Sequence, residues 1–124
     1  DGRNEIDHAE VLTLRHLLAI RPAIDPGAVT VYSTMEPCLM CFSTLLLSGV
    51  RRFVWAYEDV RGGGTNLPLY LLNPLYRTMR VHLLDRVRRD ESLRLFQQFF
   101  RTGSYWQDSL LARYTLAQTP EDSP

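Results

Sequence analysis

The sequence predicts an α/β protein in which parallel strands lie between layers of helices. Two observations support this fold class. Three short runs rich in β-branched and aromatic residues alternate along the chain with longer segments of helical periodicity. The segments between successive strands are also long enough for the crossover of about a dozen residues that parallel pairing requires. The expected architecture is therefore a three-layer α/β/α sandwich with helices on both faces of the sheet.

The chain is expected to begin with a helix and a strand. Residues 8–20 (HAEVLTLRHLLAI) are typical of a helix, with Asp7 as its N-cap and Pro22 as its stop. The apolar stripe of this helix consists of Val11, Leu14, Leu17 and Leu18. Residues 28–35 (AVTVYSTM) follow the turn residues DPG and are rich in β-branched side chains, which predicts a strand.

The middle of the chain repeats this alternation. Residues 38–47 are expected to form a helix, because Pro37 suits its start and Gly49 suits its C-terminal stop. Residues 51–57 (RRFVWAY) are typical of a second strand. The segment that follows, residues 58–68 (EDVRGGGTNLP), is a glycine-rich loop.

The last third is expected to be mainly helical. Residues 67–76 should contain a short helix that is broken by Pro74. Residues 80–84 (RVHLL) should form a third strand. A helix over residues 90–100 should then begin with Asp90 as its N-cap. Residues 106–118 (WQDSLLARYTLAQ) predict a final helix before a polar tail.

Length and composition favour a single ordinary globular domain. The chain has 124 residues, of which 45% are hydrophobic and 23% charged. Fourteen basic residues, all of them arginine, balance fourteen acidic ones, so net charge gives no general attraction to nucleic acid. No apolar run approaches the ~20 residues of a membrane span, and the polar start DGRNEIDHAE is unlike a signal peptide. We therefore expect a cytoplasmic location, where cysteines are usually thiols or metal ligands.

The stretch PCLMCF contains both cysteines of the chain, Cys38 and Cys41. At positions i and i+3 of a helix, their side chains lie on one face. In the first helical turn, unpaired backbone N–H groups and the helix dipole favour thiolates. Two such thiolates supply half of a zinc site, although a redox dithiol has the same spacing.

The other half of the site is expected from the triplet His8-Ala9-Glu10 at the start of the first helix. One neutral nitrogen of His8 would give zinc a third ligand and leave the fourth position open, as in catalytic rather than structural sites. Bound zinc lowers the pKa of water from near 16 to about 7. Glu10, two residues from a ligand, could then move protons as general base and general acid.

These motifs resemble a known family. H-x-E followed by P-C-x-x-C is the signature of zinc-dependent nucleobase deaminases, here HAE at 8–10 and TMEPCLMC at 34–41. The sequence resembles the cytidine and deoxycytidylate deaminase superfamily. It is similar to the branch of tRNA adenosine deaminases and guanine deaminases. Weaker similarity continues through RRFVWAYED, the glycine-rich loop and LFQQFF, so it extends over about residues 7–101.

The resemblance implies a cytidine deaminase-like fold with a mixed sheet whose C-terminal strands are parallel. Family members place a helix and two strands before the H-x-E triplet, and residues 1–124 are expected to form a single deaminase domain without them. The resemblance also implies substrate contacts for the backbone N–H of Ala9 and for Asp59. For Glu36, it leaves a substrate contact and a structural role open.

The motifs and the resemblance leave three functions open. The main expectation is zinc-dependent hydrolytic deamination of a free nucleobase, nucleoside or nucleotide, with a guanine-type purine favoured. Deamination of adenosine in tRNA is the first alternative. It ranks below the main expectation because FFRTGSYWQD offers only one arginine and then an acid after the phenylalanine pair, which argues against polyanion binding. A zinc-binding or redox module without turnover is the other alternative. A homodimer is implied by the resemblance alone, and no membrane partner is expected.

Overall fold

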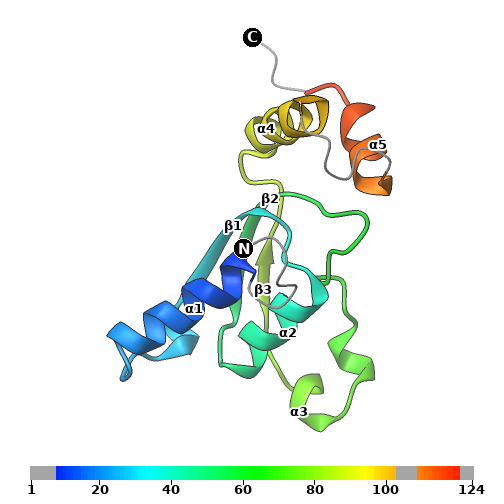
Figure 1. Cartoon of the computed structure of the whole chain (residues 1–124). Helices are drawn as coiled ribbons and strands as arrows, with labels where there is room; N and C mark the ends of the chain where they lie inside the picture. Colours follow the sequence, from blue (N-terminus) through cyan, green and yellow to red (C-terminus); the bar gives the residue numbers. More distant parts are fainter. Residues whose placement is uncertain (1–7, 103–108, 121–124) are drawn as a thin grey trace.

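The computed structural model describes residues 8–102 and 109–120 and has the predicted order of helices and strands (Figure 1). The helices and strands in chain order are α1 (Ala9–Ile20), β1 (Thr30–Met35), α2 (Leu39–Leu47), β2 (Arg52–Tyr57), α3 (Pro74–Arg77), β3 (His82–Leu84), α4 (Arg89–Thr102) and α5 (Leu110–Leu116). Two short 3₁₀ helices, η1 (Pro26–Ala28) and η2 (Leu69–Leu71), lie in the connections. The α/β class is confirmed.

The three strands form one parallel sheet in the order β1-β2-β3. Val31 of β1 lies opposite Phe53 of β2, which in turn lies opposite Leu83 of β3. The described strands agree with the predicted parallel C-terminal strands, and the mixed character of the sheet stays a prediction. Parallel pairing aligns the carboxyl ends of β1 and β2, and the backbone N–H of Glu36 donates to the carbonyl of Tyr57 at 2.8 Å.

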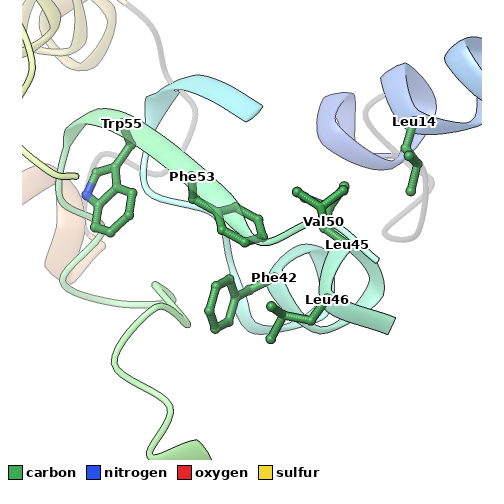
Figure 2. Close-up of a cluster of buried hydrophobic side chains, with 7 residues drawn as sticks. All are labelled: Leu14, Phe42, Leu45, Leu46, Val50, Phe53 and Trp55. Atoms are coloured by element: carbon green, nitrogen blue, oxygen red, sulfur yellow. The ribbon is translucent and has the colours of Figure 1, made fainter. Parts of the chain in front are cut away.

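One face of the sheet packs against α2, and Leu14 of α1 joins the same cluster. Figure 2 shows this cluster, whose buried members are Leu14, Phe42, Leu45, Leu46, Val50, Phe53 and Trp55. The Phe42 and Phe53 rings meet edge to face with centroids 5.0 Å apart, a favourable aromatic geometry. Gly49 has a φ of +103°, which lets the chain reverse from α2 into β2. Helix α2 is therefore anchored firmly, and its N-terminus is held at the carboxyl end of the sheet.

A second cluster lies where β2 ends. It contains Tyr57, Leu93, Phe100, Leu111 and Ala112, and it joins α4 and α5 to the sheet. In Figure 1 these two helices lie beyond the carboxyl end of the strands. On the second face of the sheet, Tyr32 of β1 is 76% exposed and Leu84 of β3 is 58% exposed, so among the described residues this part of the face lacks the helix layer predicted for both faces.

The starts of α1, α4 and α5 differ from the sequence-based prediction. His8, not Asp7, holds the N-cap position of α1. Helix α4 begins at Arg89 because Arg88, with a φ of 54°, interrupts the helical path, so Asp90 lies in the first turn. The helix predicted over residues 106–118 is α5, capped by the Ser109 hydroxyl, which accepts from the Ala112 N–H at 3.1 Å. Positions 106–108 of that prediction lie outside the described residues.

Within the part of the chain that the structure describes, no helix is both long enough and apolar enough to cross a lipid bilayer.

Candidate metal centre and active site

His8 precedes α1 and directs its ring toward α2. Its backbone is extended, with φ −70° and ψ 155°, and its side chain makes no capping hydrogen bond. The ring Nδ1 lies 3.4 Å from the Sγ of Cys38 and 3.4 Å from the Sγ of Cys41. The fold therefore brings together the three side chains that the two sequence motifs contribute.

The two cysteines lie at the start of α2: Cys41 is in its first turn, as predicted, whereas Cys38 directly precedes the helix. Cys38 is the N-cap, in an extended conformation and without a side-chain capping bond. Cys41 is fully buried one turn further along, and both thiols are free. Because α2 packs across the sheet through Phe42 and its neighbours, the side chain of Cys41 is fixed on the face that meets His8.

The donor set fits a zinc ion in chemistry and in spacing. The imidazole nitrogen and the two sulfurs all lie within 4.8 Å of one another. Tetrahedral coordination with Zn–S of about 2.3 Å and Zn–N of about 2.0–2.1 Å requires nitrogen–sulfur separations of about 3.5 Å, close to the 3.4 Å observed here. Among residues 8–102 and 109–120, this metal-ligand cluster contains only these three side chains. A three-ligand set is typical of a catalytic zinc.

The electrostatics also suit a cation. Burial raises the pKa of the Cys41 thiol, and the nearby charges of Glu10 and Cys38 raise it further. Acidic groups therefore gather here around a side chain that water does not reach. A divalent cation would stabilise the thiolate forms of both cysteines.

Glu10 lies beside this cluster and remains accessible. It is half-buried in the first turn of α1 and lines, with Ala9, a groove of about 550 Å³. Ser33 and Thr34 of β1 contribute to the opposite wall. The carboxylate is thus next to the metal-ligand cluster without being enclosed by protein, as a group that exchanges protons with a substrate requires.

Comparison with known proteins agrees with this geometry. Residues 1–57, which include His8, Glu10 and both cysteines, match the family model described as "Cytidine and deoxycytidylate deaminase zinc-binding region". Over this region the chain resembles the cytidine and deoxycytidylate deaminase superfamily. This match and the relatives described next indicate a zinc-dependent hydrolytic deaminase.

Relatives of this deaminase chain extend the similarity beyond residue 57. The chain is 22% identical over 101 residues to the tRNA-specific adenosine deaminase of Rickettsia felis, covering 82% of this chain and 70% of the relative. It is 27% identical over 99 residues to the protein of the same name from Bacillus subtilis, with 80% and 62% covered. The Agrobacterium fabrum protein is 27% identical over 95 residues, with 76% and 62% covered.

The two acids predicted as substrate contacts have partners within the chain. The Glu36 carboxylate accepts from the backbone N–H of Asp59 at 3.1 Å and of Thr65 at 3.2 Å, and also from the Thr65 hydroxyl. The Asp59 carboxylate accepts from the N–H groups of Arg61 and Gly62, at 3.0 and 2.9 Å. Substrate contacts of Ala9, Glu36 and Asp59 stay predictions.

Sequence analysis missed the residues that hold the start of α2. Gly63, Gly64 and Thr65 lie against residues 36–39, where Gly64 N–H donates to the carbonyl of Pro37 at 2.9 Å. The run GGGT was visible as a glycine-rich loop, but its contact is formed across more than twenty positions of chain. Only the alignment of the β1 and β2 carboxyl ends brings the two segments together.

Proposed function

We propose that this chain removes an amino group from a nucleobase by hydrolysis, releasing ammonia and leaving a carbonyl in its place. The observation that supports the proposal is the convergence of His8, Cys38 and Cys41 beside Glu10. A metal-ligand cluster that lacks a neighbouring acid would support metal binding but would give no group to move protons.

Each of these residues has a distinct task in the proposed reaction. His8, Cys38 and Cys41 would hold zinc, with the imidazole fixed at the N-cap of α1 and the thiolates at the first turn of α2. When bound, zinc supplies a water molecule whose pKa is lowered to about 7. Glu10 would relay both protons of the attacking water: the first to the ring nitrogen of the base, and the second, from the hydroxyl added to the ring carbon, to the amino group that leaves as ammonia.

Adenosine in tRNA is the first substrate to test. The relatives from three bacteria are all named tRNA-specific adenosine deaminases, and their similarity reaches well past the zinc-binding region. A free guanine-type purine is the second candidate. Two features argue against tRNA and so favour this candidate. The net charge is zero, and the segment after Phe100 offers one arginine and then an acid, whereas tRNA binding normally uses several phosphate contacts.

An ammonia-release assay with the zinc-loaded chain tests both candidates. The substrates are a tRNA-like RNA stem-loop containing a loop adenosine, and guanine, guanosine, adenosine and cytidine in free form. Mass spectrometry of the digested RNA measures inosine. Inosine formation would support the tRNA candidate, whereas ammonia from guanine or guanosine alone would favour the second. Zinc bound without release from any substrate would contradict the proposed function and favour a module without turnover.

Glu10→Gln is the decisive variant in this assay. We expect it to lower turnover about 10²- to 10⁴-fold, because the amide cannot accept and return protons, while zinc content stays unchanged. Glu91→Gln is the matched control, since Glu91 is an exposed acid of α4 that pairs with Arg88 just before the helix. Full activity of the Glu10 variant would contradict the assigned role.

Two further features stay predictions of this proposal. A homodimer is expected from the resemblance and can be measured by sedimentation. A cytoplasmic location is expected from composition and can be measured by fractionation of the producing cell.

A further inference from the structure

We propose that Glu36 and Gly64 are positioning residues that hold Cys38 in the conformation needed to bind the metal. They act through the glycine loop, defined here as residues 59–65. The inference rests on the proposed function only in taking Cys38 to be a zinc ligand. It replaces the predicted substrate contact of Glu36 with a different task.

The first observation is that one carboxylate connects the two ends of the glycine loop. Oε1 of Glu36 accepts from the Asp59 N–H at 3.1 Å, and Oε2 accepts from the Thr65 N–H at 3.2 Å and from the Thr65 hydroxyl. Hydrogen bonds to an ionised acceptor are about twice as strong as neutral ones. Glu36 lies two residues before Cys38, so the loop is fastened directly to the segment that carries this ligand.

The second observation is that the middle of the loop packs against the backbone at the start of α2. Gly64 N–H donates to the Pro37 carbonyl at 2.9 Å, and Gly63 forms an isolated antiparallel bridge with Cys38. A Cβ at position 64 would lie 2.4 Å from the Cα and 2.6 Å from the N of Leu39, and 3.0 Å from the carbonyl carbon of Cys38. These neighbours are main-chain atoms, so only glycine fits without moving them.

The conformation of Cys38 explains why such support is needed. Its backbone is extended, with φ −71° and ψ 171°, and its thiol makes no capping bond to α2. Cys41 is fixed by the buried packing of α2, but Cys38 lies just before the helix and has no comparable side-chain packing. Contacts from the glycine loop therefore set where the Cys38 sulfur points relative to His8.

The same contacts predict the effect of two substitutions. Gly64→Ala forces the Leu39 backbone away and turns the preceding Cys38 out of position. Glu36→Gln places an amide NH₂ against N–H donors and removes part of the loop attachment. Partners of metal ligands typically contribute about 10- to 100-fold in metal affinity, and we expect losses in this range for Gly64→Ala and at its lower end for Glu36→Gln.

Gly62→Ala is the matched control within the same loop. A Cβ at position 62 meets only Asp59 Oδ2, at 3.4 Å, which is an ordinary contact. We expect this variant to bind metal as the unchanged chain does. Thr65→Val, which removes the hydroxyl donor and keeps the backbone bond, should weaken binding slightly.

The experiment titrates the metal-free full chain and its variants with cobalt(II) and follows the visible absorption of the thiolate-bound ion. Zinc affinity is measured in parallel by competition with a chromogenic chelator, and circular dichroism checks folding. The inference predicts a weaker affinity and an altered cobalt spectrum for Gly64→Ala and Glu36→Gln, with Gly62→Ala unchanged. A spectral change marks altered ligand geometry, which a loss of global stability alone does not produce.

The outcomes separate this inference from the proposed function. Unchanged affinity and spectrum in folded Gly64→Ala and Glu36→Gln variants would overturn the inference and leave the zinc site standing. Failure of the unsubstituted chain to bind cobalt or zinc would contradict both. If Gly64→Ala does not fold, Glu36→Gln and Thr65→Val decide, because both leave the backbone and its glycines intact.

Discussion

The two helices that meet at the metal-ligand cluster begin with residues that do not cap them. His8 and Cys38 hold the N-cap positions of α1 and α2, and neither makes a side-chain capping bond. Serine or aspartate at such a position usually stabilises a helix by about 1 kcal/mol relative to a non-capping residue. Both α1 and α2 lack this local stabilisation. The side chains of His8 and Cys38 instead point toward each other.

This arrangement predicts opposite effects of Cys38→Ser on metal binding and on stability. Serine lacks the soft thiolate, so zinc content should fall to near zero, but its hydroxyl can cap α2. The metal-free variant should therefore match or exceed the metal-free parent in free energy of unfolding, by up to about 1 kcal/mol. Elemental analysis and urea denaturation measure the two quantities.

His8→Ala should likewise lose zinc, and His82→Ala is its control because His82 lies on exposed β3, away from the cluster. Retention of one zinc by either the His8 or the Cys38 variant would contradict the ligand assignment.

At the scale of elements, a network of polar side chains fixes α5 to the end of β2. Glu58 accepts from Arg89 Nε at 2.8 Å and Nη2 at 2.7 Å, and from the Tyr114 hydroxyl. Tyr57 and Thr115 share a hydroxyl hydrogen bond of 2.9 Å. The Arg89 guanidinium also lies 5.2 Å from the centre of the Tyr57 ring. These hydrogen bonds connect the end of β2 with α4 and α5 beside the second hydrophobic cluster.

The network predicts a pH dependence of stability. Burial would raise the pKa of Glu58, but hydrogen bonds from Arg89 and Tyr114 outweigh it and lower the pKa to about 2 from an ordinary value of 4.5. Because the folded-state pKa is the lower one, Glu58 stabilises the fold above pH 4.5, and this contribution is lost as pH falls from 4.5 toward 2.

Glu58→Gln should therefore destabilise the protein at pH 7 and flatten the acid limb of its stability curve. The side chains of Arg89 and Glu58 are 9% and 27% exposed. Removing one partner of a buried pair costs about 3–5 kcal/mol, and the partial exposure of Glu58 places the effect near about 3 kcal/mol. Denaturation at pH 7 and pH 3 measures it, with exposed Glu91→Gln as control. Equal losses at both pH values would contradict the assigned cause.

Helix α2 buries one face against the sheet and against Leu14 of α1. Phe42 is 1% exposed, whereas Leu47 of the same helix is 57% exposed. Phe42→Ala should lower the free energy of unfolding by about 3–5 kcal/mol, and Leu47→Ala by less than about 1 kcal/mol. Chemical denaturation measures both, and similar losses would contradict the packing described here.

At the scale of the whole molecule, β2 is the strand that both hydrophobic clusters share. Phe53 and Trp55 belong to the cluster beneath α2, and Tyr57 belongs to the cluster of α4 and α5. Strand β3 pairs with one side of β2, and its side chains are exposed. The two helical groups are therefore joined mainly through one central strand.

Hydrogen exchange should follow this order. Backbone amides of β2 and α2 should exchange slowest, because they open only when a buried cluster opens, and those of β3 and η2 should exchange faster. Mass spectrometry of peptides after deuterium labelling measures the order. Protection of β3 equal to that of β2 would contradict a stability centred on the shared strand.

The sequence by itself determined which chemistry the chain could carry and the order of its elements. Periodicity and connection length predicted the parallel strands, and His8, Glu10, Cys38 and Cys41 were identified from two short motifs and the family that these motifs resemble. These features depend on residues close together in the chain or on the preferences of single side chains, so a linear pattern records them.

Only the tertiary structure decided how the metal-ligand cluster is held and which parts of the chain the Glu36 and Glu58 carboxylates bind. Glu36 meets Thr65, Gly64 meets Leu39 and Glu58 meets Arg89 because parallel pairing brings strand ends and loops together. Such contacts join residues about twenty or more positions apart and depend on the register of β1 with β2 and on the packing of α4. No local pattern contains that information, because register and packing are set by the burial of the whole core.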